Sequence, residues 1–264
     1  MTSKFFRLTA PLFICLIFAA TASAQDFNRS YSLGTGSKIR ISSVSGNIIV
    51  KGYNGDSVVV TGIREGRDRD LVEVEDRSSG NAIDIGVRYP KSCNCDASVR
   101  FEIQVPSESK YDFDSLSSAS GDIEVSNVRG NLNIRTASGD VRVNGFDGEA
   151  RVSSASGDVR VGEVTGTVSA RAASGDVEVE ITRLEGTGNM EFSTASGDVR
   201  VSLPGNLDAD VDMATVSGSL ETDFPIQIEQ KRHGSGRRAT GRLGNGSRTL
   251  RISAASGDVS LKRM

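Results

Sequence analysis

The chain has no tryptophan, a single histidine, and few aromatic residues, which make up 5% of its length. Sites that bind sugars or nucleobases often use aromatic side chains as stacking platforms, and such platforms are scarce here. The formal net charge is −3, so nothing in the composition indicates general attraction to nucleic acid or to an anionic membrane. The lone histidine, His233, lies in a Gly- and Arg-rich segment, where we expect it to be solvated rather than catalytic.

Long hydrophobic runs are absent beyond the N-terminus. Lys4 and Arg7 precede an apolar run from Leu8 to Ala20, and Ala22-Ser23-Ala24 is a small-x-small cleavage site. This order is typical of a secretory signal peptide covering residues 1–24. The sequence therefore predicts export to the periplasm, the cell surface or the medium, with no transmembrane segment in the mature chain.

Cysteine is rare. Cys15 leaves with the signal peptide, and the mature chain keeps Cys93 and Cys95, separated by one asparagine. An oxidising compartment favours a disulfide between them, although a single intervening residue makes a tight bridge. We expect a small loop disulfide; two free thiols or an intermolecular bridge are the alternatives. Two thiols with no histidine nearby make a poor zinc site, so we predict no metal and no cofactor.

Glycine, in contrast, is abundant and regularly placed. Gly121, Gly139, Gly157 and Gly175 are each 18 residues apart, inside a recurring pentapeptide Ala-Ser-Gly-Asp-Val/Ile. A repeat this short cannot form a domain, so it predicts one turn of a solenoid whose apolar face is buried by its neighbours. The copies are Ala119–Ile123, Ala137–Val141, Ala155–Val159, Ala173–Val177, Ala195–Val199 and Ala255–Val259, with diverged copies at Val44–Ile48 and Val216–Leu220.

Within each repeat the apolar residues alternate with polar ones, which is the signature of β-strands. We expect the inward residues of three successive units to be Val141, Val143, Phe146, Ala150, Val152 and Ser154; Val159, Val161, Val164, Val168, Ala170 and Ala172; and Val177, Val179, Leu184, Met190, Phe192 and Thr194. The pattern predicts an all-β fold, a right-handed parallel β-solenoid or β-helix, with two-strand coils of about 18 residues and irregular capping ends.

The corners of the coils hold the residues that recur from repeat to repeat. Glycine suits a tight bend that needs positive φ or no side chain, and the small residues Ala137, Ala155, Ala173 and Ala195 indicate that the chain passes close to itself there. One column stacks five acids, at Asp122, Asp140, Asp158, Asp176 and Asp198. They predict either calcium binding or hydrogen bonding of the bent backbone; we favour the second, with calcium irrelevant to folding.

Three segments follow the signal peptide in a single solenoid domain, 25–264. Residues 25–117 form irregular N-terminal coils and a hairpin, in which Leu71–Glu75 and Ala82–Val87 pair as strands. Residues 118–222 carry the regular Ser-Gly-Asp repeats. Residues 223–264 hold a loop at His233–Gly246 and a closing coil at Thr249–Lys262. Irregular ends fit a solenoid, whose terminal coils must cap the core and blunt a sticky edge.

Several of these features together resemble a known group. The Val44-Ser45-Gly46-Asn47-Ile48 start, the Phe101–Pro106 strand, the serial Ser-Gly-Asp-Val units and the Asp223-Phe224-Pro225 segment are similar to the bacterial putative-adhesin β-strand-repeat family, a domain of unknown function. The resemblance covers nearly the whole mature chain. It implies an exported, single-domain right-handed β-solenoid with no assigned catalytic residues.

No segment predicts an active site, because the repetition of Ser and Asp argues for structure and the regular coils lack long inserted loops. A cluster of cations, which predicts an anion-binding patch, is formed by Lys231, Arg232, Arg237, Arg238 and Arg242; a solvated loop is the alternative. The leading hypothesis is a non-enzymatic, adhesin-like or envelope-associated binding or structural module, with an envelope glycan or surface protein as partner. A polysaccharide-acting enzyme of the β-helix type and a self-assembling scaffold are the alternatives.

Overall fold

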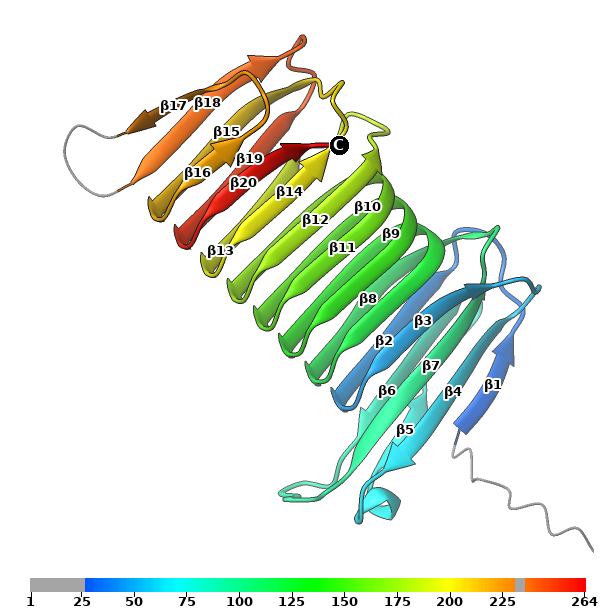
Figure 1. The fold of residues 1–264 in the computed structure, drawn as a ribbon. Coiled ribbons are helices and arrows are strands. Elements are labelled where there is room, and N and C mark those ends of the chain that lie inside the picture. Colours follow the sequence, from blue (N-terminus) through cyan, green and yellow to red (C-terminus); the bar gives the residue numbers. More distant parts are fainter. Residues whose placement is uncertain (1–26, 231–235) are drawn as a thin grey trace, which may run out of the picture.

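The structure, a computed structural model, describes residues 27–230 and 236–264, with the backbone alone for residues 228–230 (Figure 1). The predicted signal peptide, 1–24, lies outside the described residues. The described chain consists of strands, turns and one short 3-10 helix, η1 (Arg69–Leu71). The all-β prediction is confirmed.

The strands form a flattened stack with two long faces (Figure 1). Face A runs, in order of pairing, through β5 (Glu73–Asp76), β6 (Ala82–Arg88), β2 (Lys38–Ser45), β8 (Lys110–Ser120), the second halves of β9 (Ile123–Ser138), β10 (Val141–Ser156) and β11 (Val159–Ser174), then β13 (Met190–Ser196), β19 (Thr249–Ser256), β15 (Ala209–Ser217), β18 (Arg237–Leu243) and β17 (Gln227–Gln230).

Face B is made from the segments that follow each corner. It runs through β1 (Phe27–Tyr31), β4 (Val58–Glu65), β7 (Ser98–Pro106), β3 (Ile48–Tyr53), the first halves of β9, β10 and β11, then β12 (Val177–Arg183), β14 (Val199–Leu203), β20 (Val259–Arg263) and β16 (Leu220–Thr222).

The central strands pair in parallel and in register. Val141 of β10 lies opposite Ile123 of β9 on one side and opposite Val159 of β11 on the other. Each of these three strands bends at its middle, so one strand contributes to both faces (Figure 1). Equivalent side chains consequently form columns that run along the stack, about 4.8 Å apart.

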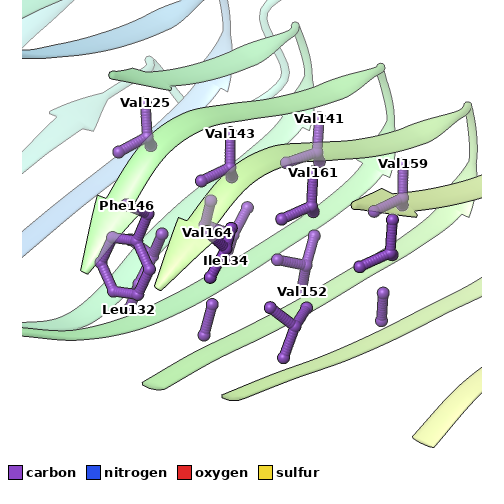
Figure 2. Close-up of a cluster of buried hydrophobic side chains, with 14 of the residues drawn as sticks. Val125, Leu132, Ile134, Val141, Val143, Phe146, Val152, Val159, Val161 and Val164 are labelled. Atoms are coloured by element: carbon purple, nitrogen blue, oxygen red, sulfur yellow. The ribbon is translucent and has the colours of Figure 1, made fainter. Parts of the chain in front are cut away.

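Alternation along the strands places one side chain in two inside the stack. The expected inward residues of β10, from Val141 to Ser154, are all buried, and Figure 2 shows the matching valines of neighbouring coils stacked over one another. Each buried side chain of this size contributes roughly 1.5–3 kcal/mol. Two coils further on, in β12, Ile181 is fully buried, whereas Leu184, just beyond the strand, is only partly buried. Ile181 thus takes the position that the sequence assigned to Leu184, beside a register shift between β11 and β12.

The corners are tight because backbone packs on backbone there. Gly157 has a φ of 138°, and a Cβ at this position would lie 2.2 Å from the carbonyl oxygen of Gly139 in the coil before. The same close approach recurs from coil to coil at Gly175 and Gly197. The close approach is made by the backbone at the glycines, whereas the neighbouring alanine side chains are exposed, at Ala137, Ala155, Ala173 and Ala195.

Both ends of the stack depart from the order of the sequence. The strands of the predicted closing coil, β19 and β20, lie inside the stack, between β13–β14 and β15–β16. At the other end, β2 and β3 lie between β6–β7 and β8–β9. The outermost strands on both ends of face A, and on the N-terminal end of face B, are antiparallel. Antiparallel strands at the ends avoid presenting a long parallel edge to other chains.

The segment His233–Gly246, predicted from the sequence to be a loop, contains a strand in the part that the structure describes. β18 (Arg237–Leu243) pairs antiparallel with β15 on one side and β17 on the other. Ala239 and Leu243 of β18 are buried, so tertiary packing overrides the Gly- and Arg-rich composition. The predicted pairing of strands near 71–75 and 82–87 is confirmed, as β5 with β6.

Candidate functional site

A ladder of hydrogen bonds runs through the aspartate column at the corners. The Oδ1 atom of Asp140 accepts the backbone N–H of Asp158 at 3.0 Å, and Oδ1 of Asp158 accepts that of Asp176 at 2.9 Å. The ladder begins at Asn47, whose Oδ1 accepts the N–H of Asp122, and ends where Asp258 accepts the N–H of Ser219. The interpretation of this column as corner hydrogen bonding is confirmed.

Arginines on face B neutralise the second oxygen of these carboxylates. Arg160 lies 2.7 Å from Oδ2 of Asp158 and 3.9 Å from Oδ2 of Asp140, and Arg200 lies between Asp176 and Asp198 in the same way. The backbone N–H of Asp176, reinforced by Arg160, holds the pKa of the Asp158 carboxyl below its ordinary value. Face B is therefore an internally compensated surface of acids and arginines.

The hydrogen bonds and ion pairs of the aspartate column bear on whether it could serve as a catalytic pair of carboxylates or as a metal site. Adjacent carboxylates stand about 4.8 Å apart, close to the separation found in retaining glycosidases. Such an enzyme needs one carboxylic acid whose pKa is raised, whereas the pKa of Asp158 and that of Asp258 are lowered. Within residues 27–230 and 236–264, no group of three or more His, Cys, Asp or Glu side chains is arranged to hold a metal ion. We expect the melting temperature to be the same in calcium as in EDTA.

Face A carries a different set of outward columns. One column alternates serine with arginine: Ser117, Arg135, Ser153, Arg171 and Ser193 lie opposite one another on successive coils. A second column, at the edge beside the corners, is an exposed line of small apolar residues: Val44, Ala119, Ala137, Ala155, Ala173, Ala195, Ala255 and Val216. A shallow hollow of about 710 Å³ follows these two columns over several coils, from Ala119 to Ala173.

The predicted anion-binding cluster is only partly within the described residues. Lys231, Arg232 and the nearby His233 lie outside them. Arg238 makes two hydrogen bonds to the carboxylate of Asp212, at 3.0 and 2.9 Å, and Arg242 makes two to Asp210, at 2.6 and 3.2 Å.

Arg237, the remaining member of the cluster, is exposed. The positive charge of β18 is thus largely balanced by the adjacent strand β15. The sequence analysis did not single out the two acids responsible, although Asp210 and Asp212 alternate along one strand, which indicates a shared outward side.

The two cysteines of the mature chain lie in the loop between β6 and β7. Their Cα atoms are 5.2 Å apart, within the range that disulfides span. The bridge between Cys93 and Cys95 stays a prediction, and mass spectrometry of the unreduced protein with and without alkylation tests it. An unchanged mass after alkylation supports the bridge.

Comparison with known proteins identifies the group to which this architecture belongs. The family model Toastrack DUF4097 matches residues 34–262, which is nearly all of the described chain. The chain belongs to the Toastrack family. The resemblance to the putative-adhesin repeat family that the motifs indicated is thereby confirmed. No curated protein matches the chain.

Several solved structures are similar to this chain over most of its length. A putative adhesin from Bacteroides fragilis is 18% identical, with a TM-score of 0.49 over 90% of this chain and 96% of its own. A putative cell adhesion protein from Clostridium sporogenes is 13% identical, with a TM-score of 0.39 over 90% and 99%. A putative lipid binding protein from Parabacteroides distasonis is 12% identical, with a TM-score of 0.42 over 89% and 96%.

A search of the described residues for a membrane-crossing helix finds none of sufficient length and apolar character.

Proposed function

We propose that this Toastrack protein is an exported, non-enzymatic binding module of the bacterial envelope. In this proposal a signal peptide, 1–24, is removed, and residues 25–264 form one right-handed solenoid domain of two-strand coils of about 18 residues. Its subdivision is 25–117 for the N-terminal coils and hairpin, 118–222 for the regular repeats and 223–264 for the C-terminal part. The partner is an envelope glycan or a surface protein.

The observation that carries the proposal is the contrast between the two faces. On face B the five aspartates from Asp122 to Asp198 each accept a backbone N–H of the next coil, and the second oxygen of each lies within 4 Å of an arginine. Face A instead presents Ser153, Arg135 and their in-register neighbours to solvent on consecutive coils. A flat surface that repeats the same groups suits contact with a partner at several points, whereas catalysis needs one distinguished constellation in a concave site.

Neither alternative function has a comparable feature in its favour. A polysaccharide hydrolase needs a proton donor whose pKa is raised, whereas the pKa of Asp158 and that of Asp258 are lowered. A self-assembling scaffold needs open strand edges at its ends, and three of the four edges are antiparallel strands of four or five residues. The fourth edge, β16, is three residues long.

A pull-down tests the proposal. The purified mature chain is incubated with fractionated envelope polymers and proteins, at low and at physiological salt. Saturable retention that survives physiological salt is the expected result. Retention that disappears at physiological salt supports only binding by the charges of the basic cluster, because exposed charges are screened over about 8 Å at this ionic strength. Retention by no fraction contradicts a binding function.

The predicted anion patch is tested in the same format. Replacing Lys231, Arg232, Arg237, Arg238 and Arg242 together by serine removes its charge. If the patch binds polyanions, the replacement abolishes the salt-sensitive part of retention. Because Arg238 and Arg242 are already paired with Asp212 and Asp210, we expect this part to be small.

A further inference from the structure

Three arginines lie near one another at the centre of face A, away from the cluster of cations between Lys231 and Arg242. Arg135 of β9 and Arg171 of β11 lie on either side of Ser153 of β10, directly opposite it in the two parallel pairings. Arg151 lies two residues before Ser153 on the same strand and points to the same side. The strand spacing puts the Cα atoms of Arg135 and Arg171 about 10 Å apart. All three arginines are exposed.

Ion pairs within the protein do not fully neutralise the positive charge of these three arginines. Of the arginines between Lys110 and Ser196, a stretch that the structure describes in full, Arg135 alone has a side chain that makes no hydrogen bond or ion pair. Arg151 pairs with Glu149 and Arg171 with Glu191, each at 2.5 Å, but the four side chains are 38 to 67% exposed. Ion pairs that exposed are worth about 0–1 kcal/mol, so an incoming anion can replace either carboxylate at small cost.

Face B offers no equivalent. Arg142 and Arg200 each lie within 4 Å of two carboxylates, and Arg160 lies within 4 Å of three. An anion approaching any of these arginines also meets the acids of the aspartate column. The free positive charge of the regular coils is therefore on face A.

The surroundings of the three arginines indicate the shape of the ligand. They line a hollow of about 410 Å³ together with Asn133, Ser153 and Ser169. Arg135 and Arg171 also border the neighbouring hollow of about 710 Å³, which continues along the alanine column. The two hollows are shallow and adjacent, and their lining alternates hydroxyl, guanidinium and methyl groups along the stack. This lining suits a chain laid across several coils better than a compact molecule, which would bury little surface here.

The chemistry of the lining favours a carbohydrate chain. Neither hollow is lined by an aromatic side chain, so neither bases nor sugar rings can stack on one here. A single-stranded nucleic acid depends on such stacking for its bases, whereas an acidic polysaccharide can be held through its hydroxyl and acid groups. Serine hydroxyls and alanine methyls match the hydroxyl groups and the apolar faces of sugar rings, and guanidinium groups bind carboxylate, sulfate or phosphate through paired hydrogen bonds.

We propose that Arg135, Arg151 and Arg171 form a binding site for an extended acidic polysaccharide. The polysaccharide lies along the stack, and its negative groups, about 10 Å apart, reach Arg135 and Arg171. The Ser153 hydroxyl donates to the carbonyl oxygen of Ile134 at 3.4 Å, so its oxygen accepts a hydrogen bond from a hydroxyl of the sugar between them. The alanine column supports the ring faces. This inference rests on the proposed binding function and assigns its ligand class and its place.

Titration calorimetry with three polymers tests the site. The probes are polygalacturonate, dextran sulfate and uncharged dextran, added to the mature chain at physiological salt. The test variant is R135S/R151S/R171S. The matched control is R67S/R88S/R183S, which removes the same charge from exposed, ion-paired arginines elsewhere. Circular dichroism and thermal unfolding establish that both variants are folded.

The expected result is binding of one or both acidic polymers but not of dextran, weakened about tenfold or more in the test variant and little changed in the control. Equal weakening of binding in both variants would mean that only the net charge of the protein matters, and it overturns the site. Acidic-polymer binding lost only in the five-fold basic-cluster variant also overturns it, while the binding function stands. No acidic-polymer binding, with saturable retention of another envelope fraction, overturns the site alone. No binding to any fraction overturns both.

Discussion

At each Ser-Gly-Asp corner two adjacent residues perform different physical tasks. Gly157 allows the backbone of one coil to lie directly against the carbonyl of the coil before it. Asp158 then connects that coil to the next through the N–H of Asp176. The motif recurs because every coil needs both contacts, and neither task leaves the residue free for another chemistry.

Replacing the corner glycine should break the stack locally. In Gly157→Ala the new Cβ meets the Gly139 carbonyl oxygen at 2.2 Å, in a φ of 138° that alanine rarely adopts. We expect a loss of at least about 1–3 kcal/mol in the free energy of unfolding, measured by urea denaturation. Gly34→Ala is the control, since a Cβ there has no atom within 4 Å. An unchanged midpoint for Gly157→Ala would contradict the corner geometry.

The aspartate ladder predicts a defined response to side-chain replacement. Asp158→Asn keeps an acceptor oxygen, as Asn47 does for the N–H of Asp122, so we expect a small effect on stability. Asp158→Ala leaves the N–H of Asp176 without its acceptor, which costs about 1–3 kcal/mol. Thermal unfolding of both variants measures the difference. Equal stability of the two would show that the hydrogen bond is unimportant.

The same ladder predicts a loss of stability in acid. The pKa of Asp158 is lower in the folded protein than its ordinary 3.8, because the N–H of Asp176 and the charge of Arg160 favour the ionised form. Its contribution is therefore complete above pH 3.8 and is lost as the pH falls through the folded pKa. Unfolding midpoints measured from pH 6 to pH 2 should fall in this lower window. Asp158→Asn should show a shallower fall, and an identical profile would argue against the coupling.

At the scale of the element, β18 shows why local composition misled the prediction. The segment Arg237–Leu243 is rich in arginine, contains a glycine and shows no strong strand pattern. It nevertheless pairs with β15 over its whole length. The decisive contacts are non-local: Arg242 lies directly opposite Asp210, and Ala239 is buried against the stack. A strand whose stability comes from its partner is not visible in its own residues.

Hydrogen exchange followed by mass spectrometry distinguishes the strand from a loop. The amides of residues 237–243 should be protected, since β18 is hydrogen-bonded on both sides. The loop of residues 184–189, which has no strand pairing, is the internal control and should exchange fast. Equal, rapid exchange in both segments would mean that β18 does not form in solution.

The position of the proposed site on face A, in contrast, follows directly from the sequence. The 18-residue spacing already puts residues 135, 153 and 171 in one column, and their in-register pairing follows once the strands are parallel. What the sequence does not supply is the pairing state of each charge. The side chain of Arg135 is unpaired, whereas Arg142 and Arg160 each lie near several carboxylates. This difference depends on side chains of neighbouring coils.

At the scale of the whole molecule, the spatial order of the coils differs from their order in the chain. The Ser-Gly-Asp-Val copies are nearly identical, so the repeat predicts that a coil has neighbours without specifying which copy they are. As a result Gly257 packs between Gly197 and Gly218, although it follows both in sequence. The central coils were predictable because there the nearest copy in sequence is also the nearest in space.

Truncation tests this order. Removing residues 249–264 takes out β19 and β20, which pair with β13, β14, β15 and β16, and so leaves a gap inside the stack. We expect the truncated protein to lose its folded C-terminal part beyond β14, with a lower melting temperature and rapid proteolysis after Leu203. Removing only the exposed Met264 is the control. A truncated protein that keeps residues 209–243 folded would contradict the intercalated order.

The most direct test of the account is size-exclusion chromatography with light scattering on the mature chain mixed with an acidic polysaccharide. The account predicts that protein co-elutes with the polymer, that the polymer keeps its molar mass, and that the protein alone elutes without growing assemblies as its concentration rises. A polymer shortened during incubation would identify an enzyme. Assemblies that grow with protein concentration would identify a scaffold, and separate elution of protein and polymer would contradict the proposed ligand.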